Sequence, residues 1–242
     1  MWQGITSSIT VWGADLGYDG MASGEEFKWK IWQTSSATES NAIATYDTLS
    51  FPNTAYFITN GISGVLSLNA TNYQSQILSF PLGWSMFSTY INPTDANIAN
   101  VFNSISTNVI IVKNGMGMIY WPQYSLNSIG NMAIGEGYQI KIDSNKTLDV
   151  TGLAVIPETT PINIVSGWSI IGYLRQSPAQ ISNMLSGIVS EIIIVKNYLG
   201  YIYWPAYSLN SIGNMNPGEG YQIKLENAVQ LTYPANTSNL SK

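Results

Sequence analysis

The sequence predicts an α+β fold that is rich in β-structure, and three observations lead to this prediction. Hydrophobic residues make up 45% of the 242 residues, which supports a folded protein, whereas only 10% are charged. Asn, Ser, Thr, Tyr and Gly are abundant, and these residue types favour strands and turns over long helices. One long phrase also occurs twice, so the chain contains a repeated structural unit.

The repeated phrase is IYWPQYSLNSIGNM at 119–132 and IYWPAYSLNSIGNM at 202–215, identical at 13 of 14 positions. The motifs GW, VKN and GEGYQIK recur around it, at an offset of 84 residues for GW and 83 for the other two. We therefore predict four segments: an N-terminal β domain at 1–70, repeat modules at 74–152 and 158–234, and a C-terminal tail at 235–242.

The N-terminal segment contains five alternating stretches typical of strands, with turn residues between them: SSITVW, EFKWKIW, NAIATYD, AYFIT and GVLSLNA. This pattern predicts an immunoglobulin-like β-sandwich. The segment is short for that fold, so either the sandwich is reduced or its first strand or two lie outside this sequence.

Each module is predicted to be a small sheet with one helix packed on it. Apolar segments before and after each GW indicate two strands joined at Gly. Thr94 and Ser177 are the expected N-caps, and the i, i+3, i+4, i+7 apolar spacing from Ile98 and from Ile181 predicts an amphipathic helix of about three turns.

The second half of each module is predicted to be a hairpin and two more strands. The runs NVIIVKN and EIIIVKN have the composition of buried strands, and MIYWP and YIYWP follow them after Gly-containing turns. GEGYQIK opens a further strand, and a last short strand follows. The linker LAVIPETTP contains two prolines and is short, so the modules should lie side by side in a fixed relation.

Composition excludes several classes of function. The chain has no Cys and no His, which removes thiol and Ser-His-Asp nucleophiles and the usual zinc, copper and haem sites. A net charge of −5 with nine Lys plus Arg argues against nucleic-acid binding, and the apolar runs are too short for membrane insertion. Glu136 and Glu219 could pair as catalytic carboxylates, but they occupy equivalent places in separate modules, whereas a glycosidase needs a spacing of about 5–10 Å. We expect no enzyme.

The YWP-x-Y segments are candidate ligand sites. Neighbouring strand residues point to opposite faces, so one of Tyr120 and Trp121 is expected inside and the other at the surface. An exposed ring beside Asn amides can stack on a sugar, although core packing is the alternative. The candidate residues in both copies are Tyr120, Trp121, Tyr124, Asn127, Tyr203, Trp204, Tyr207 and Asn210.

The acidic stretch DLGYDGMASGEE at 15–26 is a candidate calcium loop, and no other cofactor is expected. Asp15, Asp19 and Glu26 stand at positions 1, 5 and 12 of the loop pattern, but Gly17 replaces the usual ligand at position 3. A solvated turn is the alternative.

The motifs GWS, IVKN-x-x-G-x-x-YWP, SIGNM and GEGYQIK resemble tandem repeats near the C-terminal ends of large secreted Bacteroidetes proteins, many exported by the type IX secretion system. Similar repeats occur in structural proteins of marine bacteriophages. The resemblance implies an extracellular or cell-surface, non-enzymatic structural or adhesion protein. Its tandem modules would serve as a spacer and as a weak binding platform for polysaccharide.

The alternative is a virion component such as a tail or head fibre, with neighbouring structural proteins as partners. The low charge and the Met start without a visible signal peptide favour this alternative.

Overall fold

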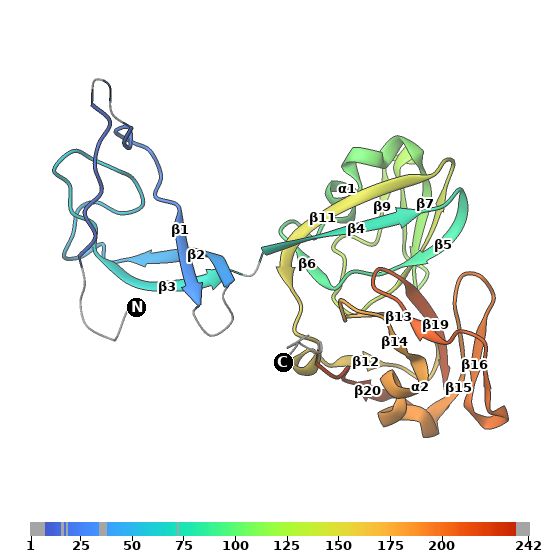
Figure 1. Ribbon diagram of the computed structural model, residues 1–242. Coiled ribbons are helices and arrows are strands. Elements are labelled where there is room, and N and C mark those ends of the chain that lie inside the picture. The colour runs from blue at the N-terminus through green and yellow to red at the C-terminus, as the bar shows by residue number, and fades with distance from the viewer. Residues whose placement is uncertain (1–7, 16, 18, 34–37, 72, 236–242) are drawn as a thin grey trace. The chain divides into compact units, whose positions relative to one another are not determined.

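The chain folds into two compact units that divide between Asn72 and Tyr73 (Figure 1). The computed structural model describes residues 8–15, 17, 19–33, 38–71 and 73–235. Strands dominate and helices are short, so the predicted α+β, β-rich class is confirmed. Among the described residues, no helix has the length and apolar character needed to cross a bilayer.

The N-terminal unit contains one antiparallel sheet of three strands in the order β1-β2-β3: β1 (Trp29–Gln33), β2 (Thr38–Tyr46) and β3 (Val65–Thr71). The stretches 8–12 and 55–59, also predicted as strands, contain no strand. Nearby the chain makes isolated bridges, such as Glu26 with Tyr56. A sandwich needs two packed sheets, and the described part of this unit has one, so the immunoglobulin-like arrangement is not confirmed.

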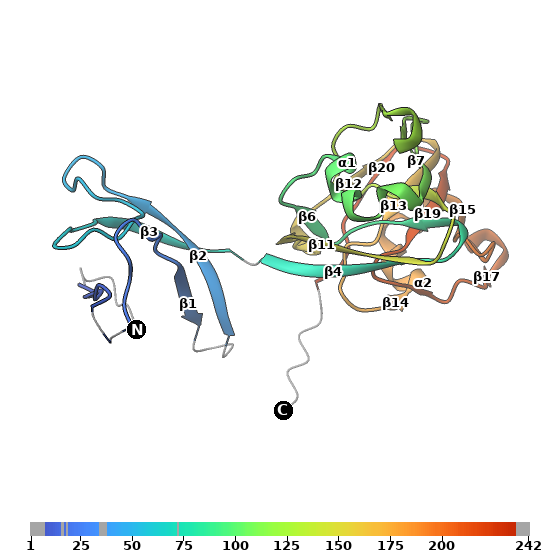
Figure 2. The ribbon, with the colours of Figure 1, turned by 90° about the horizontal axis from the view of Figure 1, so that it is seen from above.

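The second unit holds both repeat modules, with the first above the second in Figure 1. The first module has a five-stranded sheet, β5-β10-β7-β8-β9, and a three-stranded sheet, β4-β11-β6. β4 lies beside β11 in both views (Figures 1 and 2). The strands are β4 (Tyr73–Phe80), β5 (Gly83–Phe87), β6 (Ile91–Pro93), β7 (Val109–Asn114), β8 (Ile119–Trp121), β9 (Leu126–Asn127), β10 (Tyr138–Ile142) and β11 (Lys146–Ala154).

The second module repeats the five-stranded sheet in the same order, β13-β19-β15-β16-β17, and adds the pairs β12-β20 and β14-β18. The sequence repeat is therefore a structural repeat. The strands are β12 (Ile162–Ile164), β13 (Gly167–Gly172), β14 (Ala179–Gln180), β15 (Ile192–Lys196), β16 (Ile202–Trp204), β17 (Leu209–Asn210), β18 (Asn214–Met215), β19 (Gly220–Leu225) and β20 (Val229–Leu231).

The helices differ from the prediction of about three α-helical turns. α1 (Ile98–Val101) continues as the 3₁₀ helix η1 (Asn103–Asn108), and α2 (Ile181–Met184) continues as η4 (Ser186–Glu191). Ser side chains in the second half bond to backbone carbonyls, as Ser106 Oγ does to Asn103 O at 3.0 Å, which favours the tighter turn. Three further 3₁₀ turns are η2 (Pro122–Tyr124), η3 (Pro157–Thr159) and η5 (Pro205–Tyr207).

The expected N-caps Thr94 and Ser177 were also wrong. Asn97 caps α1, since its Oδ1 accepts a bond of 3.1 Å from Ala99 N, and Gln180 precedes α2 without a side-chain cap. The helix cannot start earlier because Ala96 O accepts a bond from Met132 N at 2.7 Å, which holds the chain extended before Asn97.

Each module has its own hydrophobic core beneath its helix. The predicted apolar spacing is correct here, because Ile98, Phe102 and Ile105 are buried in the first core, and their counterparts Ile181, Leu185 and Ile188 are buried in the second. The core side of each helix thus follows from the sequence even though the helix type does not.

The two modules pair through equivalent backbone groups. Ser88 N donates to Gly218 O at 3.0 Å, and Gly172 N donates to Gly135 O at 2.8 Å. Gly172 is the counterpart of Ser88, and Gly218 is the counterpart of Gly135. Each contact is therefore matched by its reciprocal, as in a twofold dimer, and the modules form one compact unit.

Candidate ligand-binding surface

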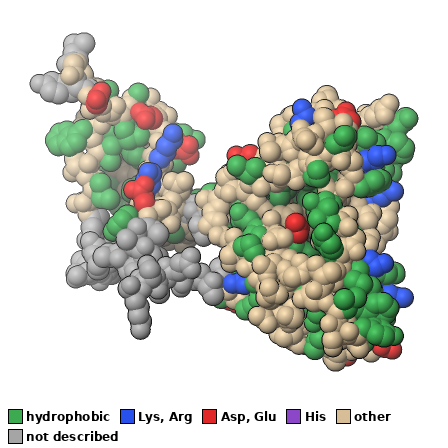
Figure 3. Space-filling view, turned by 45° about the vertical axis from the view of Figure 1, so that its right-hand side comes forward, with side chains coloured by type: hydrophobic (Ala, Val, Ile, Leu, Met, Phe, Trp, Pro, Cys, Tyr) green, Lys and Arg blue, Asp and Glu red, His purple; other side chains and the backbone are tan. Residues whose placement is uncertain are grey.

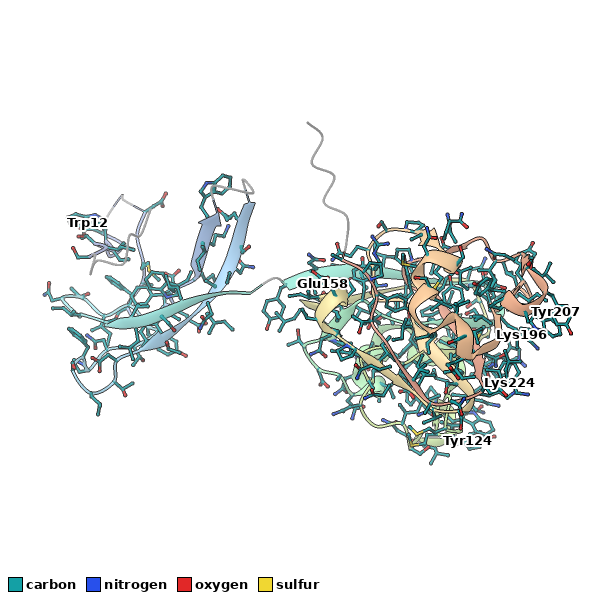
Figure 4. The ribbon with its side chains drawn as sticks, turned by 90° about the horizontal axis from the view of Figure 1, so that it is seen from below. Trp12, Tyr124, Glu158, Lys196, Tyr207 and Lys224 are labelled. Carbon is teal, nitrogen blue, oxygen red and sulfur yellow. The ribbon has the colours of Figure 1, made fainter. Side chains whose placement is uncertain are left out.

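The loops that contain the YWP-x-Y segments at 120–124 and 203–207, which we call the YWP loops, expose a tyrosine ring more than the tryptophan ring. Tyr120 and its counterpart Tyr203 are buried, and Trp121 and Trp204 are half-buried. The exposed rings are Tyr124 and Tyr207, at 64% and 71%, and each lies 4.6 Å, centroid to centroid, from the Trp three residues before it. Both tyrosines lie at the outside of the second unit (Figure 4).

The polar side chains of these loops hold the loops themselves. Asn127 Oδ1 accepts from Gly130 N at 2.9 Å, and Asn210 Oδ1 accepts from Gly213 N at the same distance. The Asn127 amide nitrogen also donates to Asn97 Oδ1 at 3.2 Å. The side-chain oxygens of the predicted Asn residues are thus used to hold the turn.

The identity of the repeated phrase has the same explanation. Ser128 Oγ accepts from Ile119 N at 2.8 Å and donates to Ile119 O at 3.1 Å, so the hydroxyl joins the loop to β8. Gly130 O accepts from Ile98 N at 2.9 Å and so fixes the start of α1. A change in this loop would disturb the helix above it.

The glutamates of GEG lie at the join between the modules. Glu136 forms a backbone bridge with Ile171 of the other module, and Glu219 forms the reciprocal bridge with Phe87. Each carboxylate is bonded within its own module: Tyr138 Oη donates to Glu136 Oε2 at 2.6 Å, and Tyr221 Oη donates to Glu219 Oε2 at 2.6 Å.

The hydroxyl groups of the two tyrosines also bond to the backbone of the turn that precedes each GEG motif. Tyr138 Oη accepts from Ala133 N, and Tyr221 Oη accepts from Asn216 N, each at 2.8 Å. Burial, together with the adjacent carboxylate, raises the pKa of both tyrosines well above the usual range. The Glu–Tyr pairs are therefore structural groups that order the turn.

Glycine is required at this join. A Cβ on Gly137 would lie 2.6 Å from Ile171 O, and a Cβ on Gly220 would lie 2.8 Å from Phe87 O. Where Ser88 meets Gly172, a Cβ on the glycine would lie 2.9 Å from the serine Cβ. The modules approach so closely that a side chain larger than hydrogen displaces the opposing backbone.

A second aromatic surface lies on the outer face of each five-stranded sheet. Trp84 on β5 pairs with Lys141 on β10, and Lys113 lies on the next strand, β7. The two ammonium groups lie 5.8 and 5.3 Å from the centre of the Trp84 ring, within the range of cation–π attraction. The ring is 47% exposed.

The second module repeats this arrangement. Lys196 Nζ lies 5.1 Å and Lys224 Nζ 5.9 Å from the centre of the Trp168 ring, which is also 47% exposed. Figure 4 shows Lys196 and Lys224 on the same side of the second unit. We call the two groups, Trp84 with Lys113 and Lys141, and Trp168 with Lys196 and Lys224, the Trp–Lys clusters.

Each Trp–Lys cluster borders a hollow that the other module completes. The first, of about 300 Å³, lies between Trp84 and the turn at Asn197 and Tyr198. The second, of about 280 Å³, lies between Trp168 and the equivalent turn at Asn114 and Gly115. In Figure 3, Lys or Arg side chains lie beside hydrophobic side chains along the right-hand edge of the second unit.

The two hollows are neighbours. Lys113, Gln139 and Gln222 line both, and the two glutamines are equivalent positions of the repeat. Neither lining includes an Asp or Glu, and among the described residues none of the four clustered lysines is in an ion pair. The surface therefore combines apolar rings, amides and uncompensated positive charge.

Sequence reasoning did not identify this surface. The signal was present, because GW, VKN and QIK are identical in both copies and supply all six cluster residues. These motifs were interpreted as strand markers, since the sequence alone does not show that their side chains share one face.

The acids of the candidate calcium loop are not gathered into a ligand group among the residues that the structure describes. Within the part of the chain that is described, no group of three or more His, Cys, Asp or Glu side chains could hold a metal ion, so Asp15, Asp19 and Glu26 do not come together as one. Leu16 and Tyr18, which belong to that loop, lie outside the described residues.

Comparison with known proteins adds no relative: no family model, curated protein or solved structure matches this chain.

Proposed function

We propose that this chain is a non-enzymatic structural or adhesion protein of an extracellular or cell-surface setting, and that its two-module unit binds polysaccharide. The observation that carries the proposal is the pair of equivalent hollows, each with a half-exposed Trp ring beside amide and ammonium groups. Apolar rings with a few polar groups around them are the usual composition of a sugar site.

The paired modules support a platform function. Each module supplies the ring of one hollow and the opposing turn of the other, so neither hollow is complete in an isolated module. The reciprocal backbone bonds hold the two hollows in a fixed relation. A repetitive ligand that reaches both gains from a high effective concentration even if each contact is weak.

The proposal places binding at the Trp–Lys clusters and not at the YWP loops, because the amide oxygens of the loop asparagines already accept bonds within the loop. Affinity electrophoresis of the full chain in gels containing different polysaccharides tests this. Trp84→Ala and Trp168→Ala should each reduce retardation, whereas Tyr207→Ala, which removes an exposed ring from a YWP loop, should not. If retardation falls only in Tyr207→Ala, the binding site lies at the YWP loops and not at the Trp–Lys clusters.

A second candidate, a structural component of a virion or similar assembly, is favoured by the N-terminal unit. Its exposed large side chains include Leu49 at 98%, Trp12 at 77% and Trp32 at 60%, and Phe57 is the one large hydrophobic residue that is buried among the described residues of this unit. Light scattering of the full chain tests this candidate: stable homo-oligomers without polysaccharide affinity would support it.

Calcium binding by Asp15, Asp19 and Glu26 is a separate hypothesis. Three carboxylates would supply part of the six to eight oxygen ligands that calcium takes. Calorimetry with millimolar calcium decides it: heat of binding together with a chelator-sensitive melting temperature supports the site, and the absence of both rejects it.

A further inference from the structure

We infer that the polysaccharide bound by the Trp–Lys clusters is polyanionic, carrying carboxylate or sulfate groups, and that one chain crosses both hollows. The inference rests on the proposed function and adds the chemical class of its ligand.

The first argument is the distribution of charge. The chain has nine Lys plus Arg and a net charge of −5, yet four of the nine lie in the two clusters. None of these four is paired with a carboxylate among the described residues, and no Asp or Glu lines either hollow. A neutral glycan would leave these charges unused, whereas an anionic one would compensate them.

The second argument is the geometry around each ring. Cross-strand register places Lys141 directly opposite Trp84, and Lys224 directly opposite Trp168. An acidic sugar has an apolar C–H face and an anionic group at its edge. The ammonium groups lie over the rings, 5.1–5.9 Å from the ring centres. An anionic group that pairs with them would bring the C–H face of its sugar to the exposed part of the same ring.

The third argument is continuity between the hollows. Lys113, Gln139 and Gln222 line both, so a chain that leaves one hollow enters the other without crossing an acidic surface. The pseudo-twofold relation reverses the chain direction between the two clusters. Recognition by ring stacking and charge tolerates that reversal better than a directional set of hydrogen bonds would.

Nucleic acid is a different polyanion and is disfavoured. The remainder of the chain is acidic, and the basic surface is limited to two small clusters, which is not the extended footprint that a phosphate backbone needs. A single-stranded oligonucleotide therefore serves as a comparison ligand in the test.

The test is titration calorimetry of the full chain with galacturonic acid oligomers and, as a matched neutral ligand, the methyl esters of the same oligomers. We expect at least tenfold tighter binding of the acid form, weakened by added salt. We also expect the affinity to rise with oligomer length until both hollows are filled. Lys113→Gln combined with Lys196→Gln should cost tenfold or more in affinity for the acid form. Lys146→Gln, which removes a lysine outside the Trp–Lys clusters and outside both hollows, should change it less than twofold.

The outcomes separate the two proposals. Equal binding of acid and ester, with no effect of the lysine changes, overturns the polyanion inference and leaves the proposed function intact. Tighter binding of the oligonucleotide than of the acidic oligomer also overturns the inference. Failure of the folded protein to bind any polysaccharide, charged or neutral, overturns the proposed function itself. Thermal melting of each variant establishes that the fold is kept.

Discussion

Replacing Gly137 by Ala should weaken the contact between the two modules. The added Cβ would lie 2.6 Å from Ile171 O and 2.7 Å from Ile170 Cγ2, so the opposing strand must move. Overpacking of this kind costs about 1–3 kcal/mol. The bond of 3.0 Å from Gly137 N to Ile170 O would also be lost or weakened, at about 1 kcal/mol. We expect a total loss of about 2–4 kcal/mol.

Gly220→Ala should cost a similar amount, because its Cβ would lie 2.8 Å from Phe87 O in the reciprocal contact. Gly187→Ala is the matched control. Gly187 lies in η4, its φ is not positive, and no atom lies within 4 Å of the added Cβ, so the change should be neutral or stabilising by up to about 1 kcal/mol.

Thermal melting followed by circular dichroism measures these changes. A loss of about 2–4 kcal/mol corresponds to a fall in melting temperature of roughly 5–15 °C for a unit of this size. If Gly137→Ala and Gly220→Ala melt like Gly187→Ala, the close approach of the modules does not exist in solution and the reasoning fails.

Three further predictions concern single groups. The pKa values of Tyr138 and Tyr221 are raised in the folded state, so the unfolded chain loses these protons at a lower pH. The free energy of unfolding should therefore fall as the pH rises above about 10. The fall should be less steep in the double variant Tyr138→Phe, Tyr221→Phe. Ser88→Ala removes bonds to Glu219 O at 2.6 Å and from Tyr173 N at 3.0 Å, and urea unfolding should show a loss of about 1–3 kcal/mol. Asn127→Ala should cost about 1–2 kcal/mol by the same measurement, and an unchanged midpoint would contradict the structural role of the loop amide.

The sequence predicted most features that a single module determines. The β7–β8 hairpin and the buried side of each helix follow from local spacing, which reflects the periodicity of each element. The predicted helix type was wrong because Ser side chains bond to nearby backbone carbonyls, and apolar spacing does not report this competition.

Features that depend on the contact between modules could not be predicted. The hollows combine Trp84 with a turn more than one hundred residues later, at Asn197 and Tyr198. The periodicity of a strand or helix does not report a contact between residues so far apart in the sequence. The GW, VKN and QIK motifs also have the composition of ordinary strands, so nothing in them singles out a surface. The GEG motif is visibly identical in both copies. Its glycines are needed because Gly137 lies against Ile171 O of the other module, and this tertiary contact cannot be read from the sequence.

The contact between Ser88 and Gly172 fits a first module to a second module and not to a copy of itself. A first module facing another first module would bring two serine side chains together where a second Cβ lies only 2.9 Å from the first. Two second modules would place glycine against glycine and lose the bonds that Ser88 Oγ makes. If modules were exchanged between molecules, a first module would therefore join a second, and the product would be either a closed, swapped dimer or an open filament.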